Sequence, residues 1–292
     1  MKIGLMDVDG HNFPNLALMK IAAWEKGRGN EVEWLNNFKE YDRVYKAKVF
    51  TFTPEDHTPI KAKEIYQGGT GYDLTSRLPK EVEEIYPDYS LYGIKNKAYG
   101  FLTRGCPRGC QFCIVGEKEG LKSYKVADLE RFWQGQKEIV LLDPNTLAAR
   151  EWKELLDQLE KSGAWIDFSQ GLDIRLMTQE KAEAINRLKV KMIHFAWDNY
   201  PDQKTYEQLK RYRPQFKLRG RELRVYVLTN FNTTAEQDLE RIYKLRELDY
   251  DPYVMVYDRD KLPRGHITRR IQRWVNNKYI WRECEKFEDY RR

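Results

Sequence analysis

In the stretch Tyr99-Gly-Phe-Leu-Thr-Arg-Gly-Cys106-Pro-Arg-Gly-Cys110-Gln-Phe-Cys113, three cysteines follow one another with the spacing C-x3-C-x2-C, and the 292-residue chain has only one other cysteine. The glycines and the proline between them predict a tight loop directly after a strand. Three thiolates brought together by such a loop form a site for a soft metal. Structural zinc sites and electron-transfer clusters normally take four protein ligands, so three ligands predict a cluster with one iron open to a small molecule.

This cysteine spacing, with the aromatic Phe112 before the last cysteine, resembles the radical S-adenosylmethionine (radical SAM) superfamily. The resemblance implies that Cys106, Cys110 and Cys113 bind a [4Fe–4S] cluster and that SAM chelates the fourth iron. It implies reductive cleavage of SAM to a 5′-deoxyadenosyl radical, which abstracts hydrogen from a substrate. An electron donor such as flavodoxin or ferredoxin is the partner expected for this chemistry.

A zinc site is the alternative for these cysteines, and it requires a fourth ligand. The nearest histidines in the sequence are His57 and His194, and neither has the spacing of a zinc finger. Arg104 and Arg108 flank the loop, and we expect their charges to favour thiolates. Cys284 is the only remaining cysteine, so a second all-cysteine cluster is excluded.

From Ala98 onward, apolar strands alternate with amphipathic helices. Strands are predicted at 99–104, 139–143, 165–169, 192–197, 223–229 and 253–257, and helices at 125–134, 148–162, 178–188, 202–212, 234–248 and 266–280. Continuous apolar strands are typical of parallel strands buried on both faces. Six such repeats predict an α/β fold with a partial (β/α)6 TIM-type barrel over residues 95–292, ending in a basic helical segment. The radical SAM resemblance implies the same fold.

Residues 1–94 predict a small Rossmann-like α/β domain. Strands are expected at 3–7, 31–35 and within 43–53, a helix at 15–26, a glycine-rich turn at 67–71 and a linker at 78–97. The layout resembles the cobalamin-binding domain of one radical SAM branch, whose Asp-x-His-x-x-Gly motif places a histidine on cobalt. Here Asp9-Gly-His11-Asn-Phe-Pro14 ends in proline, so we expect no tight binding of cobalamin through His11, while base-off binding stays open.

Polar residues follow several predicted strands, at the edge where parallel α/β sheets place their active sites. The resemblance implies that Asp143 and Asn145 hold the SAM amino group. Arg175 is the candidate for the SAM carboxylate, because a guanidinium binds a carboxylate through two hydrogen bonds. Gln170 and Asp173 are candidates for ribose or methionyl contacts.

Asn199 and Asn230, after the fourth and fifth strands of the barrel, complete the cofactor-binding set together with Phe112. Structural roles are open for the same residues. Asp143 could instead cap a helix, Asn199 could form a turn, and Asn230 could belong to a capping arrangement.

Charge is unevenly distributed along the chain, whose net charge is +6. Residues 1–94 carry a net charge of −3 and residues 95–292 a net charge of +9, concentrated in 204–224 and 259–292. Basic segments with interleaved aromatics bind nucleic acid in many proteins, although a solvated helix face has the same composition. The sequence does not identify the substrate, and nucleic acid or a peptide are the candidates. The alternative function is a non-catalytic iron–sulfur or zinc protein that binds nucleic acid through the basic C-terminal half.

No apolar run approaches the ~20 residues that span a membrane, and 33% of the residues are charged. Four cysteines, three of them clustered, do not form a disulfide framework. We therefore expect a cytoplasmic protein without a membrane partner.

Overall fold

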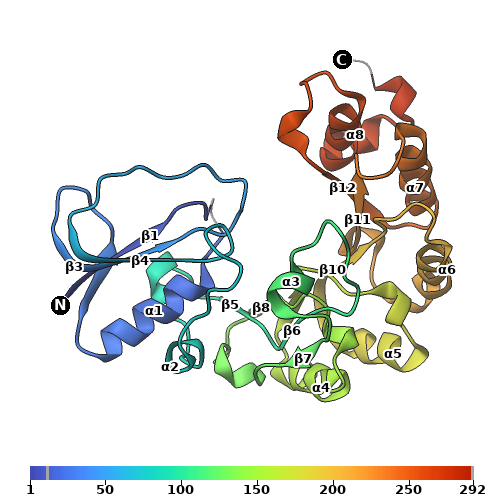
Figure 1. The fold of residues 1–292 in the computed structure, drawn as a ribbon. Coiled ribbons are helices and arrows are strands. Elements are labelled where there is room, and N and C mark those ends of the chain that lie inside the picture. The colour runs from blue at the N-terminus through green and yellow to red at the C-terminus, as the bar shows by residue number, and fades with distance from the viewer. Residues whose placement is uncertain (11–12, 291–292) are drawn as a thin grey trace.

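The computed structural model describes residues 1–10 and 13–290, and most of its strands belong to two separate parallel sheets (Figure 1). The expectation for His11 falls outside the described residues. The chain is of the α/β class, as predicted.

The N-terminal sheet has four parallel strands in the order β2-β1-β3-β4. They are β1 (Lys2–Asp7), β2 (Glu31–Trp34), β3 (Tyr41–Ala47) and β4 (Ala62–Gly68). Helix α1 (Leu16–Gly27) follows β1. Asn15 caps the start of this helix, because its side chain accepts a hydrogen bond from Leu18 N at 3.2 Å. Buried Ile3 and Leu5 of the central strand β1 pack with α1, which forms a small core.

The segment between the two sheets is more ordered than the predicted linker. It contains α2 (Lys80–Glu83) and the 3-10 helix η1 (Tyr89–Tyr92). The Tyr89 hydroxyl donates to Phe132 O at 2.7 Å and accepts from Tyr99 N at 2.9 Å, so this segment is built into the core of the larger sheet.

The larger sheet has six parallel strands that lie side by side in chain order. They are β5 (Lys97–Gly100), β8 (Glu138–Leu141), β9 (Trp165–Phe168), β10 (Lys189–Ala196), β11 (Leu223–Thr229) and β12 (Asp251–Val256). The crossover helices are α4 (Trp152–Ser162), α5 (Gln179–Arg187), α6 (Gln203–Tyr212) and α7 (Ala235–Glu247). Figure 1 shows these helices along the outer side of the sheet, as right-handed crossovers between neighbouring strands require.

Two predictions in the first repeat are wrong. The strand expected at 99–104 leaves the sheet after Gly100, and Thr103–Arg104 (β6) instead pairs antiparallel with Tyr124–Lys125 (β7). The helix expected at 125–134 is replaced by β7 and a single 3-10 turn, η2 (Leu129–Arg131). The backbone N–H groups of Val126 and Ala127 donate to Leu102 O, which keeps the start of this segment extended.

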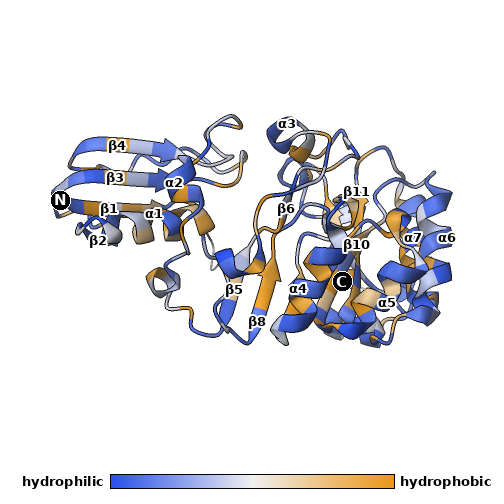
Figure 2. Cartoon of the chain, turned by 90° about the horizontal axis from the view of Figure 1, so that it is seen from below, coloured by the Kyte–Doolittle hydropathy of each residue, from blue (hydrophilic) through white to orange (hydrophobic). Residues whose placement is uncertain are grey.

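Two other differences have local causes. The helix expected at 266–280 is divided into α8 (Ile267–Asn276) and α9 (Lys278–Glu283), because Asn277 is extended and caps α9 with its side chain. β4 was not predicted because its residues are mostly polar and exposed, as befits an edge strand. Figure 2 shows the contrast between the largely hydrophilic β4 and the hydrophobic β8. In the described part of the chain, the helices are too short or too polar to cross a bilayer.

Candidate functional site

The three clustered cysteines lie on a loop of residues 105–114, here called the cysteine loop. It runs from β6 to the short helix α3 (Val115–Glu119), and the chain returns through β7. Gly105 has φ +76°, and a Cβ atom at this position would lie 2.1 Å from the carbonyl oxygen of Lys122. Only glycine therefore fits where the loop departs from β6.

The three cysteines share this one loop and differ in exposure. Cys106 and Cys110 are partly buried, and Cys113 is exposed. Burial raises the pKa of the Cys110 thiol, and the neighbouring Cys113 raises it further. The Cys113 residue is exposed, yet enough protein surrounds its sulfur for burial to raise its pKa as well. In residues 1–10 and 13–290, no three His, Cys, Asp or Glu side chains converge as ready-made metal ligands.

The two arginines that flank the loop are paired with carboxylates. Arg104 binds Glu119 at 2.6 Å, and Arg108 forms an ion pair with Asp173. Their charges are therefore partly neutralised. Burial is the largest influence on the pKa of Cys110 and Cys113, and neither of these two arginines is prominent among the charges that act on them.

Asp143 follows β8 and fastens the start of the cysteine loop to the sheet. Its carboxylate accepts hydrogen bonds from Leu102 N at 3.0 Å, Thr103 N at 2.5 Å and Thr103 Oγ1 at 2.6 Å. The side chain is buried, which raises its pKa to about 6. The carboxylate that was expected to bind the SAM amino group thus has three partners within the protein.

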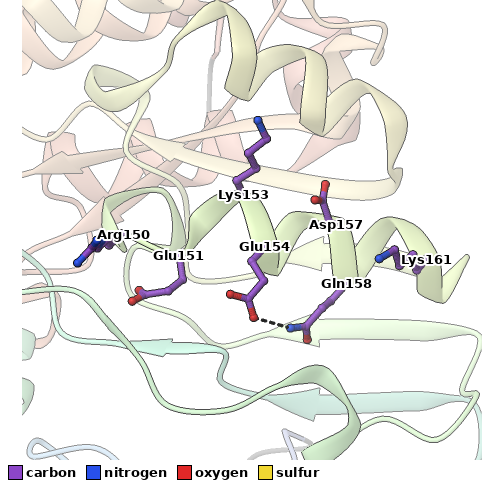
Figure 3. Close-up of a pocket in the computed structure, with 7 residues that line it drawn as sticks. All are labelled: Arg150, Glu151, Lys153, Glu154, Asp157, Gln158 and Lys161. Atoms are coloured by element: carbon purple, nitrogen blue, oxygen red, sulfur yellow. Dashed lines mark hydrogen bonds between the residues drawn. The ribbon is translucent and has the colours of Figure 1, made fainter.

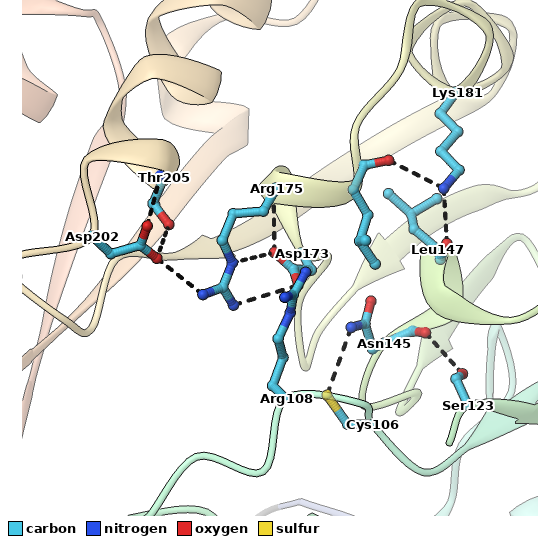
Figure 4. A network of polar contacts seen from close by, with 11 residues as sticks. Cys106, Arg108, Ser123, Asn145, Leu147, Asp173, Arg175, Lys181, Asp202 and Thr205 are labelled. Atoms are coloured by element: carbon cyan, nitrogen blue, oxygen red, sulfur yellow. Dashed lines mark hydrogen bonds and ion pairs between the residues drawn. The ribbon is translucent and has the colours of Figure 1, made fainter. Parts of the chain in front are cut away.

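The Asn145 side chain contacts a cysteine of the loop. Its Nδ2 lies 3.6 Å from Cys106 Sγ, within the range of an N–H···S hydrogen bond (Figure 4). The Ser123 hydroxyl donates to the Asn145 carbonyl at 3.0 Å, and Asn145 is 2% exposed. Its Oδ1 is buried and lacks a partner among the described residues. Ser123 was not predicted, and the sequence around it carries no signal for this role.

Asp173 and Arg175 belong to one ionic network with Arg108 and Asp202 (Figure 4). Arg175 Nε donates to Asp173 Oδ1 at 2.8 Å, and Arg175 Nη1 donates to Asp202 Oδ2 at 3.0 Å. The guanidinium that was expected to bind the SAM carboxylate therefore already contacts two protein carboxylates. Asp202 was not predicted for the site, although its position at the N-cap of α6 was a recognisable sequence signal.

The other side of the cysteine loop contacts the ends of β11 and β12. The Phe112 ring meets Phe231 edge-on with 5.4 Å between ring centroids, and Phe231 meets Tyr257 at 4.9 Å. Asn230 has φ +61°, and its Nδ2 donates to Tyr257 O at 2.8 Å, which ties the two strand ends together. The loop thus contacts residues that follow β8, β9 and β11 at the carboxyl ends of the strands.

Two of the predicted site residues have exposed side chains, and Asp198, which is outside the predicted set, is more enclosed. Gln170 and Asn199 lie at the same edge of the sheet with exposed side chains. Asp198, at the end of β10, accepts a hydrogen bond from Leu228 N at 3.2 Å. Burial raises its pKa to about 6, and its charge contributes to raising the pKa of Cys110.

Some cations of the basic C-terminal segments make intramolecular contacts. Arg224 and Lys278 both pair with Asp251, at 2.8 and 2.5 Å. Arg269 donates to Leu262 O at 2.8 Å. Arg224 and Lys278 are therefore partly neutralised by Asp251.

A shallow hollow on the outer side of α4 lies among charged side chains (Figure 3). Lys153, which borders it, pairs with Glu180 at 2.6 Å, and Glu154 accepts from Gln158 at 3.4 Å. These are ordinary helix-surface contacts, so we assign no chemistry to this hollow.

No model of a known protein family matches the chain, and no curated protein sequence matches it either.

Proposed function

We propose that this protein is a radical SAM enzyme that binds a [4Fe–4S] cluster through Cys106, Cys110 and Cys113. The observation that carries the proposal is the position of the cysteine loop across the carboxyl ends of the parallel strands. Chemistry gathers at this edge in parallel α/β folds. We further propose that the six strands, which follow chain order, form a partial (β/α)6 barrel.

The donor set fits such a cluster in its chemistry. Three thiols of one loop supply soft ligands, and their number leaves one iron for another ligand. Cys284 cannot complete the set as a loop neighbour, because it lies at the end of α9, where its carbonyl accepts from Trp274 Nε1 at 3.0 Å. When bound, the cluster would supply the electron that cleaves SAM.

The surrounding residues have supporting roles in this proposal. Asp143 holds the loop against the sheet, and Asn145 donates a hydrogen bond to a ligand sulfur. Asp198 lies at the strand ends, partly buried, and is suited to accept a hydrogen bond from SAM or substrate. Phe112 and Phe231 form an apolar wall that excludes water from one side of the site.

The test is anaerobic reconstitution with iron and sulfide, followed by incubation with SAM and dithionite. We expect 5′-deoxyadenosine as a product. Its absence from a protein that contains a full cluster would refute the proposal and favour a non-catalytic iron–sulfur protein. The proposal also includes a flavodoxin or ferredoxin as the electron donor and a cytoplasmic location. It does not include cobalamin. Copurification of base-on cobalamin would contradict that last point.

A further inference from the structure

A glycine-rich loop, Gly68-Gly-Thr-Gly71, follows β4 and lies beside α3, the helix that follows the cysteine loop. Gly69 has φ +97°, and a Cβ atom there would lie 2.4 Å from Lys48 O, so only glycine fits. The loop therefore brings backbone and hydroxyl groups of the N-terminal sheet close to the candidate active site.

Two cations connect the glycine-rich loop with α3. Lys118 Nζ donates a hydrogen bond to Thr70 Oγ1. Arg77 Nη2 donates to the carbonyl of Lys118, while its Nη1 donates to Leu74 O at 2.7 Å and Ser76 O at 2.9 Å. Lys118 is five residues beyond Cys113, so both cations lie next to the cysteine loop.

These two cations have no ionic partner among residues 1–10 and 13–290. The contacts of Arg77 are with carbonyl oxygens, and that of Lys118 is with a hydroxyl. Glu119, the neighbouring carboxylate on α3, pairs with Arg104 at 2.6 Å and accepts from Gly105 N at 3.0 Å. Burial lowers the pKa of Lys118, the charges of Arg104 and Arg77 lower it further, and the charge of Glu119 opposes them. Lys118 and Arg77 therefore lie close together, and the nearby Glu119 is already paired with Arg104.

Asp73, an acidic residue of the same segment, accepts hydrogen bonds within its own turn. Asp73 accepts from Thr75 N at 2.8 Å and from the hydroxyl of Ser76 at 2.6 Å. Lys48 adds a third cation under the loop: it is 7% exposed, and its Nζ lies 4.6 Å from the centre of the Tyr72 ring. The described contacts thus leave an anion as the missing partner.

We propose that Arg77, Lys118 and Thr70 form a binding site for a phosphate group of the substrate. A guanidinium, an ammonium and a hydroxyl are the donors that proteins use for phosphate, and glycines allow close approach of the backbone. A bound phosphate supplies the missing counter-ion and holds the rest of the substrate beside the cysteine loop. The inference rests on the proposed function, since it names the substrate class of that same site as a phosphate-bearing molecule.

The test measures binding of adenosine monophosphate and of a short single-stranded oligonucleotide to the full-length protein by calorimetry at low ionic strength. We expect binding, with Kd increased roughly ten- to hundredfold by Lys118→Gln and by Arg77→Gln, because each removes a charge-assisted hydrogen bond. Lys118→Arg should restore most of the affinity. The matched control is Lys153→Gln, which removes the same charge from the outer side of α4 and should leave Kd within about twofold.

Binding of the mononucleotide as tightly as the oligonucleotide identifies a small substrate, and tighter, salt-sensitive binding of the oligonucleotide identifies a nucleic acid. Failure of both probes to bind, or an equal loss with Lys153→Gln, would overturn the inference. Thermal unfolding of each variant shows whether it folds. If Lys118→Gln does not fold, Arg77→Gln is the variant whose Kd is compared with that of the wild-type protein. SAM cleavage by the wild-type protein is measured in parallel. Cleavage without phosphate binding overturns this inference alone, and phosphate binding without cleavage overturns the proposed function alone.

Discussion

Thr103 and Asp143 are joined by two hydrogen bonds, because the backbone N–H and the hydroxyl of Thr103 both donate to Asp143 Oδ2, at 2.5 and 2.6 Å. The pair links the residue that begins β6 to the residue that follows β8. It is buried, and it sets the point at which the chain leaves the larger sheet to form the cysteine loop.

We predict that this buried carboxyl group makes stability depend on pH in the acidic range. Its pKa of about 6 in the folded protein lies above the ordinary value of 3.8, so the folded state binds the proton more tightly. The stabilisation is complete below about pH 4 and is lost as the pH rises through about 6, an effect of roughly 3 kcal/mol. Urea unfolding should show the stability advantage of wild type over Asp143→Asn shrinking over this range. An advantage that is constant or grows with pH would contradict the prediction.

Substitution of the individual cysteines should distinguish the three cluster ligands from Cys284. Cys106→Ala, Cys110→Ala or Cys113→Ala should each abolish the visible absorbance of the reconstituted iron–sulfur cluster. Cys284→Ala should retain it, because Cys284 contributes its backbone carbonyl to Trp274. Iron and sulfide content are measured alongside. A requirement for Cys284 would indicate a closed four-thiolate site and refute the assignment.

Asn145→Leu should lower the reduction potential of the cluster. Asn145 Nδ2 lies 3.6 Å from Cys106 Sγ, and a hydrogen bond to a ligand sulfur stabilises the more negative, reduced cluster. A net contribution of about 1 kcal/mol corresponds to roughly 40 mV for a one-electron couple. Asn145→Gln keeps the amide and serves as the control. An unchanged potential in both variants, with full cluster content, would show that the amide does not act on the sulfur.

The buried ion pair of α7 should be essential for stability. Arg241 and Asp238 lie 2.6 Å apart at 0% and 1% exposure of their side chains, and Arg241 also donates to Leu228 O at 2.7 Å. Arg241→Met leaves the carboxylate buried without its ionic partner and should cost roughly 3–5 kcal/mol. Glu240→Ala removes an exposed pair with Lys244 on the same helix and should cost less than about 1 kcal/mol. Chemical denaturation at neutral pH compares the two, and equal losses would contradict this reasoning.

The regular repeats of the larger sheet could be predicted from the sequence because their signals are local. β11 is a continuous apolar strand, and α7 begins with a Thr234 capping box and has a buried face that follows the helical period. The N-terminal strand β4 has no such pattern. It is held by pairing with β3 and by side-chain partners such as Asp42, which pairs with Lys63 at 2.5 Å.

The candidate site was predictable in its position and only partly in its contacts. The cysteine spacing and the polar strand ends indicate where the site lies. The partners of Asp143 could not be predicted, because Thr103 is 40 residues away and its approach depends on the chain leaving the sheet after Gly100. Arg175 was expected to be available for a ligand, and its pairing with Asp202 depends on how α6 packs.

The order of strands in the larger sheet also bears on how the protein is made. Each strand from β8 to β12 lies next to the strand that precedes it in that sheet, so a chain leaving the ribosome can add every new strand to an edge that already exists. The N-terminal sheet assembles differently, because β1 must receive β2 on one side and β3 on the other. The larger sheet thus grows in one direction during translation, from β5 to β12.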